Sequence, residues 1–157
     1  MTKKEKPVIL VCIDKSKAST IALKYAYLKA KKLGFEIRIL SVIKQDHKNL
    51  LFGSHTIARE NRVETEANVK KVISEIFIND DELPLSKITE GEVSSEIVKE
   101  IRSDSNYVSL VLGKSQSSAQ SDNSVMSKIA DKISRKINVP IQIVPENIED
   151  NIFKIMI

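Results

Sequence analysis

The sequence predicts an α/β fold, with an open, mostly parallel five-stranded sheet that carries helices on both faces. Five apolar runs alternate with four amphipathic helical patterns along the 157 residues. The first run is continuous rather than alternating, which is typical of a strand buried on both faces of a parallel sheet. Strands that alternate with helices join through right-handed crossovers and give a doubly wound sheet. The length suits one domain with a single core.

The first strand and helix are expected within residues 7–34. The run PVILVCID predicts a buried strand that ends at Asp14. Residues 15–34 follow as a helix, and either Asp14 or Ser16 is expected to cap its N-terminus. Gly34 is the expected C-terminal cap. The small residues of this helix allow a close approach to the sheet along an apolar stripe of Ala18, Ala22, Leu23, Ala26, Ala30 and Leu33.

A second strand is predicted at 35–43, followed by a loop at 44–56. His47 and His55 fall in this loop, and their spacing is not that of a metal site, so we expect surface histidines. A helical pattern returns from Ile57 to about Ile78. Its inner side is predicted to comprise Val69, Val72, Ile73, Ile76 and Phe77.

The C-terminal half predicts three more strands and two more helices. The strand at 85–91 has more polar residues and is expected near an edge of the sheet. A helix at 92–104, a strand at 107–113, a helix at 125–137 and a strand at 139–144 follow. The tail at 146–157 ends in apolar residues, which predicts an added edge strand or a surface that covers a partner.

Composition excludes several classes of protein. The net charge of +4 is mild, and lysines are interleaved with acids, so we expect a solvated surface and no nucleic-acid binding. No apolar run approaches about 18 residues, so no membrane span is expected and the cytoplasm is the default location. The single cysteine, Cys12, lies in an apolar run and is expected to act as a small buried hydrophobe. No Ser/His/Asp or Cys/His set has the ordered spacing of a catalytic site.

The loop after Gly113 is the most informative stretch of the chain. It follows the first strand of a strand–loop–helix–strand unit, the position at which such folds receive phosphates. Yet residues 114–127 contain no glycine and are rich in serine. Gly113 therefore has two interpretations, a close approach to phosphate or a plain turn from strand to loop, and we favour the turn. The architecture favours a nucleotide site, while the local chemistry argues against one.

Taken in their order along the chain, these motifs resemble those of the universal stress protein family over residues 7–145. Residues 146–157 form a C-terminal extension. VILVCID and its alanine-rich helix ending in Leu-Gly are similar to the family's opening, and EIRILSVI is similar to its second strand. GEVSSEIVKEI matches the spacing of its Gly-Asp-Pro-Ala helix, and NVPIQIVP its final strand. The resemblance implies a Rossmann-like fold of the adenine nucleotide α-hydrolase-like group.

The family's nucleotide-binding members carry a phosphate motif of three glycines after the fourth strand. The first glycine is Gly113, and the second falls on Gln116. A serine or threonine follows the third glycine of the motif. Counted forward from Gly113, the third glycine falls on Met126 and the serine or threonine position on Ser127. Counted back from the last strand, the third glycine falls on Ser127 and the serine or threonine position on Lys128. Both later glycines are thus absent, and a side chain at these positions crowds the approach of phosphate to the backbone.

The resemblance implies a cleft for ATP with magnesium, held by Asp14, Val42, Gly113, Ser115 and Ser127. It also implies a homodimer through the final strand, Pro140 to Val144, because exposed edge strands pair readily. The expected function is a non-enzymatic regulatory or protective role in the stress response, with weak or no ATP binding. The alternative is an adenine-nucleotide sensor with slow ATP hydrolysis through an altered phosphate loop.

Overall fold

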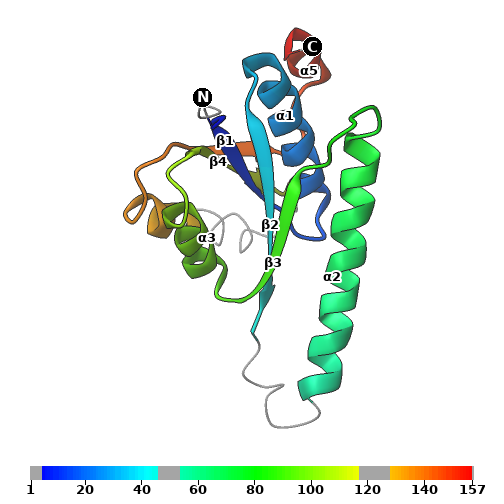
Figure 1. The fold of residues 1–157 in the computed structure, drawn as a ribbon, viewed down its shortest axis with the longest axis vertical. Helices are drawn as coiled ribbons and strands as arrows, with labels where there is room; N and C mark the ends of the chain where they lie inside the picture. The colour runs from blue at the N-terminus through cyan, green and yellow to red at the C-terminus, as the bar shows by residue number, and fades with distance from the viewer. Residues whose placement is uncertain (1–4, 46–53, 117–127, 157) are drawn as a thin grey trace.

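Five parallel strands form one sheet in the order β3-β2-β1-β4-β5 (Figure 1). The computed structural model describes residues 5–45, 54–116 and 128–156 of the chain. The predicted α/β class and the edge position of the third strand are confirmed. The strands are β1 (Val8–Cys12), β2 (Glu36–Lys44), β3 (Leu85–Gly91), β4 (Tyr107–Lys114) and β5 (Ile141–Pro145).

β1 is the central strand of the sheet, and its apolar sequence explains this position. Residues 8–11 are at most 1% exposed, because β2 and β4 pair with β1 on its two sides and helices cover both faces. β1 is shorter than predicted. It ends at Cys12 because the N–H of Asp14 leaves the sheet and donates to the Ser19 hydroxyl at 3.1 Å.

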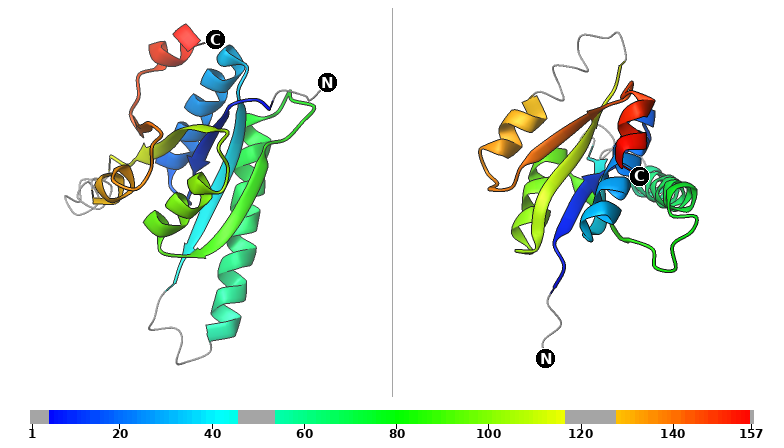
Figure 2. Two further views of the ribbon diagram at one scale, coloured as in Figure 1. Left: turned by 60° about the vertical axis from the view of Figure 1, so that its left-hand side comes forward. Right: turned by 90° about the horizontal axis from the view of Figure 1, so that it is seen from above.

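Helices cover both faces of the sheet and produce two core layers (Figure 2). α1 (Lys17–Leu33) and α2 (Ser54–Ile76) cover one face. α3 (Val93–Arg102) and the helical residues 128–134 cover the other. No helix in the described parts of the chain is long and apolar enough to cross a membrane.

The predicted inner side of α2 is confirmed, since Val69, Val72, Ile73 and Phe77 are buried and Ile76 packs against them. Two details of the predicted helices are wrong. α2 begins at Ser54, so His55 belongs to a helix rather than a loop, while His47 lies outside the described residues. Leu33 is 50% exposed and does not belong to the buried stripe of α1, whose last buried residue is Ala30. Gly34 ends α1 as expected, with φ of 73°.

The C-terminal tail does not add an edge strand, which corrects that prediction. It forms the short helix α5 (Asp150–Met156), which packs against α1. The ammonium group of Lys24 lies 4.8 Å from the centre of the Phe153 ring, and Lys32 donates to the carbonyl oxygen of Ile155 at 3.4 Å. Ile148, in the connection from β5, packs on the core. These contacts hold the tail against α1, although no residue of α5 is fully buried and Ile155 is 72% exposed.

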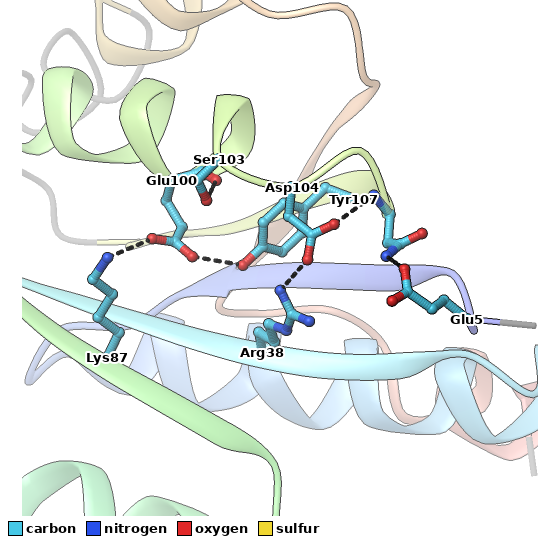
Figure 3. Close-up of polar contacts among 8 residues, drawn as sticks. Glu5, Arg38, Lys87, Glu100, Ser103, Asp104 and Tyr107 are labelled. Atoms are coloured by element: carbon cyan, nitrogen blue, oxygen red, sulfur yellow. Dashed lines mark hydrogen bonds and ion pairs between the residues drawn. The ribbon is translucent and has the colours of Figure 1, made fainter. Parts of the chain in front are cut away.

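A polar cluster ties the strands to α3 on one face of the sheet (Figure 3). Arg38 of β2 pairs with Asp104 at 2.6 Å, and the Tyr107 hydroxyl of β4 donates to Glu100 of α3 at 2.8 Å. Lys87 of β3 pairs with the same carboxylate at 3.1 Å. Burial, together with the nearby Glu100 carboxylate, raises the pKa of Tyr107 to about 12, so this hydroxyl remains a donor at neutral pH.

Candidate functional site

A cleft of about 330 Å³ lies at the carboxyl ends of β1, β2 and β4. Open parallel sheets place ligands at this edge. Four of the five predicted site residues line the cleft, namely Asp14, Val42, Gly113 and Ser115. The fifth, Ser127, lies outside the described residues, as does Met126. The other lining residues are Cys12, Ile13, Ser16, Ser19, Lys44, Val93, Ile97, Leu112 and Ile129.

Asp14 shapes the turn that opens the cleft. Its carboxylate accepts from the N–H of Ser16 at 2.7 Å, and its carbonyl oxygen accepts from Ser19 at 3.0 Å and from Asn68 of α2 at 3.1 Å. The N-cap of α1 is Ser16, whose hydroxyl accepts from the N–H of Ser19 at 3.2 Å. Of the two residues predicted as N-cap, Asp14 and Ser16, the structure therefore has Ser16 in that role. The roles of Ser19 and Asn68 were not predicted.

Val42 presents the backbone edge of β2 to the cleft. The N–H of Ile13 donates to the carbonyl oxygen of Leu40 at 2.9 Å, so Leu40 points its backbone groups toward β1. Alternate residues of a strand point these groups to the same side, so Val42 does likewise. Because β1 has already ended at that level, the N–H donor and C=O acceptor of Val42 face the cleft rather than a strand.

Gly113 lies inside β4, opposite Val144 of β5, so the prediction of a turn at this residue is wrong. The reason for glycine here is close packing against α1. A Cβ at this position would lie 2.4 Å from the carbonyl oxygen of Ala18 and 2.8 Å from the backbone nitrogen of Ser19. The first turn of α1 therefore rests directly on the backbone of β4. This packing requires glycine whether or not phosphate binds.

Beyond Gly113, the backbone of Gln116, which takes the position of the second motif glycine, contacts the carboxylate of Glu146. The N–H of Gln116 donates to Oε2 of Glu146 at 2.9 Å, and the Ser115 hydroxyl donates to the same oxygen at 3.4 Å. Glu146 follows β5 directly and was missed in the sequence. The only available signal was the pairing of β4 with β5, which places Pro145 opposite Lys114.

The N-terminus of α3 borders a second hollow of about 440 Å³, which shares Lys44, Val93 and Ile129 with the cleft. Its N-cap, Glu92, accepts from Ser94 at 2.6 Å and pairs with Lys132. The Lys132 ammonium group, followed by the serine hydroxyls, lowers the pKa of Glu92 to about 2. This ion pair joins α3 to the helical residues 128–134 and forms one wall of the site. No group of metal-binding side chains gathers among the described residues.

A larger hollow of about 530 Å³ lies at the opposite, amino-terminal ends of β2 and β3. Aromatic side chains line it, including Tyr27 and Phe77, whose ring centroids are 4.6 Å apart. Two of its charged side chains are already paired, Lys31 with Asp80 at 2.9 Å and Arg38 with Asp104 at 2.6 Å. The cleft at the carboxyl ends, where a backbone edge and several polar side chains meet, is the better candidate.

Cys12 lines the cleft but does not supply a reactive thiolate. Burial, and to a lesser degree the Asp14 carboxylate, raise the pKa of the Cys12 thiol to about 12. A thiol with such a pKa stays protonated at neutral pH and is a poor nucleophile. Cys12 is partly rather than fully buried, because it lies at the end of β1 where the cleft opens, so the prediction of a buried hydrophobe holds only in part.

A model of the universal stress protein family matches residues 7–145. The chain belongs to this family. UspA from Lactobacillus plantarum has a similar structure, with a TM-score of 0.73 and 13% identity over 90% of this chain and 99% of that one. A family protein from Burkholderia pseudomallei gives a TM-score of 0.65 and 14% identity over 91% and 98%. A family protein from Arabidopsis thaliana with AMP bound gives 0.57 and 16% identity over 90% and 93%. No curated protein matches the chain.

These structural similarities cover about nine tenths of the chain and concern its architecture. At identities of 13–16% they show the fold alone.

Proposed function

We propose that this universal stress protein acts by binding rather than by catalysis, in a regulatory or protective role in the cytoplasm, and that it binds ATP weakly or not at all. The observation that carries the proposal is the contact between Gln116 and Glu146. The backbone N–H at the second motif position donates to a carboxylate at 2.9 Å, so it is engaged by an anion of the chain itself. A phosphate group would have to displace that carboxylate and then pass the Gln116 side chain.

The chemistry of the cleft lining supports a binding role. Hydrolysis of ATP needs groups that position water and stabilise charge on the transferred phosphoryl group, usually with a metal ion. The side chains that line the described part of the cleft include one cation, Lys44, and one carboxylate, Asp14. The Asp14 carboxylate accepts from the Ser16 N–H at 2.7 Å and thereby stabilises the turn before α1.

Calorimetric titration of the nucleotide-stripped protein with Mg-ATP tests the proposal. We expect no saturable heat below millimolar ATP, together with no phosphate release above the buffer rate. A micromolar dissociation constant, equivalent to about −8 kcal/mol, would contradict the proposal and favour the sensor described next. Repeating the titration at a second temperature guards against a binding enthalpy near zero.

The second candidate is an adenine-nucleotide sensor with slow hydrolysis. The observation that favours it is the cleft, in which Asp14, Val42 and Gly113 meet at the carboxyl ends of three strands. The Arabidopsis thaliana relative that holds AMP shares this fold. In this alternative Ser115, together with Ser127 or Lys128, would hold the phosphates.

Substitution of both Gln116 and Met126 by glycine discriminates the two candidates, because it restores the motif glycines. Under the binding proposal the double variant gains affinity for Mg-ATP over wild type. If wild type already binds Mg-ATP tightly and the glycines change nothing, the sensor is the correct interpretation.

We further propose a homodimer through the free edge of β5. The N–H of Leu110 donates to Pro140 and the N–H of Glu146 donates to Lys114, so alternate residues of β5 face β4. Ile141 and Ile143 consequently point their backbone groups outward, and Ile143 is 40% exposed. Pro145 has the same outward orientation but no N–H, which limits the length of any pairing.

Sedimentation velocity tests the dimer. Ile143→Lys adds a charge at the centre of the free edge, and we expect it to shift the protein to monomer. Ile155→Lys is the matched control, because Ile155 is 72% exposed and belongs to α5 rather than to β5. A wild-type monomer at high concentration would contradict the proposal, as would equal effects of the two substitutions.

A further inference from the structure

A basic hollow of about 400 Å³ lies where the C-terminal half of α3 meets the turn after the helical residues 128–134. Figure 1 shows these two segments side by side on one face of the sheet. The lining of the basic hollow comprises Lys99, Arg102 and Lys136 together with Ser95, Val98 and Ser103. It therefore has three cations and no carboxylate, and it shares no lining residue with the cleft.

The charge of the basic hollow is hidden in the sequence, because acids are interleaved with the cations along both segments. In the structure those acids are engaged elsewhere. Three of them are held in the ion pairs Glu92–Lys132, Glu100–Lys87 and Asp131–Arg135. The fourth, Glu96, lies against Gly91 at the other end of α3. Among the described residues, neither Lys99 nor Lys136 has an ion-pair partner, so their charges remain available to a ligand.

Arg102 is held in a fixed direction at the basic hollow. Its Nη2 group donates to the carbonyl oxygen of Lys136 at 2.8 Å. The carbonyl group carries no net charge, so this bond orients the guanidinium group without neutralising it and uses one of its five N–H donors. The hydroxyls of Ser95 and Ser103 donate to groups of α3 and its N-cap. The cations are therefore the groups of the basic hollow that recognise a ligand.

The C-terminal ends of two helical segments meet at the basic hollow, which sets a second requirement on the ligand. Each helix end carries about half a negative charge and carbonyl oxygens that lack an intrahelical donor. Two such ends amount to about one negative charge. The three cations therefore leave an excess of positive charge. The ligand that fits best supplies carboxylates for the cations and N–H donors for the carbonyl oxygens.

This combination favours a polypeptide over the other large anions of a cell. The phosphodiester backbone of a nucleic acid has no N–H donors, and the lining offers no aromatic side chain for a base to stack on. A lipid surface requires exposed apolar side chains beside the cations. None of the exposed large apolar side chains of the described residues belongs to α3 or to residues 128–137.

We infer that the basic hollow is a docking site for an acidic segment of a partner protein, whose carboxylates contact Lys99, Arg102 and Lys136. The inference goes beyond the proposed function, because it names a second surface and the chemistry of its partner. It does not depend on whether the cleft takes a nucleotide, since the two sites share no lining residue. Complementary charge of this kind speeds association and weakens as salt is added.

Fluorescence anisotropy of a labelled hexaglutamate peptide, titrated with the protein at low and at high ionic strength, tests the inference. We expect saturable binding at low ionic strength, and binding of labelled hexaglutamine that is weaker by at least about tenfold. Each exposed ion pair that is removed should weaken hexaglutamate binding about two- to fivefold, so the double variant Lys99→Gln with Lys136→Gln should weaken it about tenfold. The single variants should each show the smaller effect.

Lys70→Gln with Lys71→Gln is the matched control. It removes the same net charge from two exposed residues of α2, on the opposite face of the sheet. It should leave the affinity for hexaglutamate unchanged. Equal losses from the two double variants would mean that only the net charge matters, and this overturns the inference. Thermal melting of each variant separates binding from stability. A Lys99/Lys136 variant that melts earlier but binds as wild type does would show that these lysines serve only the helix ends, which also overturns it.

Three further results with wild type would overturn the inference. The first is no saturable binding of hexaglutamate at low ionic strength. The second is displacement of hexaglutamate by inorganic phosphate at constant ionic strength, which would indicate a site for a small anion. The third is tighter binding of a single-stranded hexanucleotide than of hexaglutamate, which would indicate a nucleic-acid surface. Tight binding of Mg-ATP, by contrast, would overturn the proposed function and leave the docking site untouched.

Discussion

Replacement of Gly113 by alanine tests the close packing of α1 on the sheet. The added Cβ would lie 2.4 Å from the carbonyl oxygen of Ala18, 2.6 Å from its carbonyl carbon and 2.8 Å from the nitrogen of Ser19. Ordinary contacts begin near 3.4 Å, so the first turn of α1 must move by about 1 Å. The atoms in the way belong to the backbone and cannot rotate aside.

Overpacking of this kind costs about 1–3 kcal/mol, and the rigid backbone places Gly113→Ala at the upper end. For a chain of this size each kcal/mol lowers the melting temperature by about 2–4 °C, so we expect a loss of about 6–12 °C. Urea unfolding followed by circular dichroism gives the corresponding free energy of unfolding.

Gly34→Ala is the matched comparison for Gly113→Ala. Gly34 has φ of 73° and nothing within 4 Å of an added Cβ, so alanine there meets only the backbone penalty of about 1–2 kcal/mol. Gly113→Ala should therefore be the more destabilising of the two. A Gly113→Ala protein that unfolds within about 1 °C of wild type would refute the reasoning, because α1 would then not rest on β4 as described.

Three further predictions concern single side chains. Ser16→Ala removes the N-cap of α1 and should lower the free energy of unfolding in urea by about 1 kcal/mol; an unchanged transition would contradict the cap. Cys12 is partly buried and its pKa is raised to about 12, so it should react with thiol reagents near pH 8 more slowly than in the unfolded protein, and labelling at the rate of a free thiol would contradict the raised pKa. The backbone N–H of Asn106, followed by Arg38, lowers the pKa of Asp104 from its usual 3.8 in the folded protein. The Asp104 carboxylate therefore stabilises the fold fully above pH 3.8, and this stabilisation is lost as pH falls through the lowered pKa. Asp104→Asn should thus destabilise at neutral pH and approach wild type in acid, and a constant difference across that range would argue against the ion pair in Figure 3.

Most of the sheet could be predicted from the sequence because burial on both faces leaves a simple pattern. β1 reads as an unbroken apolar run, and its residues 8–11 are almost fully buried. Glycine at the end of α1 marks a left-handed cap, and Gly34 adopts one. The polar content of β3 predicted its edge position, since an edge strand is covered less completely.

The tail was predicted less well because its helix depends on a distant partner. α5 has seven residues, and a helix of that length is marginal without tertiary contacts. Its contacts with Lys24 and Lys32 come from a segment more than 100 residues earlier in the chain. The apolar residues of the tail predicted a contact, but the sequence could not show that α1 would supply it or that Ile155 would stay 72% exposed.

The cleft was partly predictable, and the part that was missed depends on strand register. The sequence placed Asp14, Val42 and Gly113 at strand ends, and parallel strands bring these ends together. Glu146 carried no comparable signal, because it lies 30 residues from Gln116 and outside any motif. Only the pairing of Lys114 with Pro145 places the next residues of both strands within reach.

The identities of residues 113 and 116 differ in how strongly they indicate phosphate binding. Gly113 is required by the contact with Ala18 alone, so its presence is compatible with a phosphate site and with the loss of one. At Gln116 no such packing demand is visible among the described residues, since Gln116 is exposed and its N–H donates to Glu146. A glycine there would serve phosphate and little else. The identity of residue 116, together with the carboxylate that faces it, is therefore a better guide to the ligand than the glycine that matches the motif.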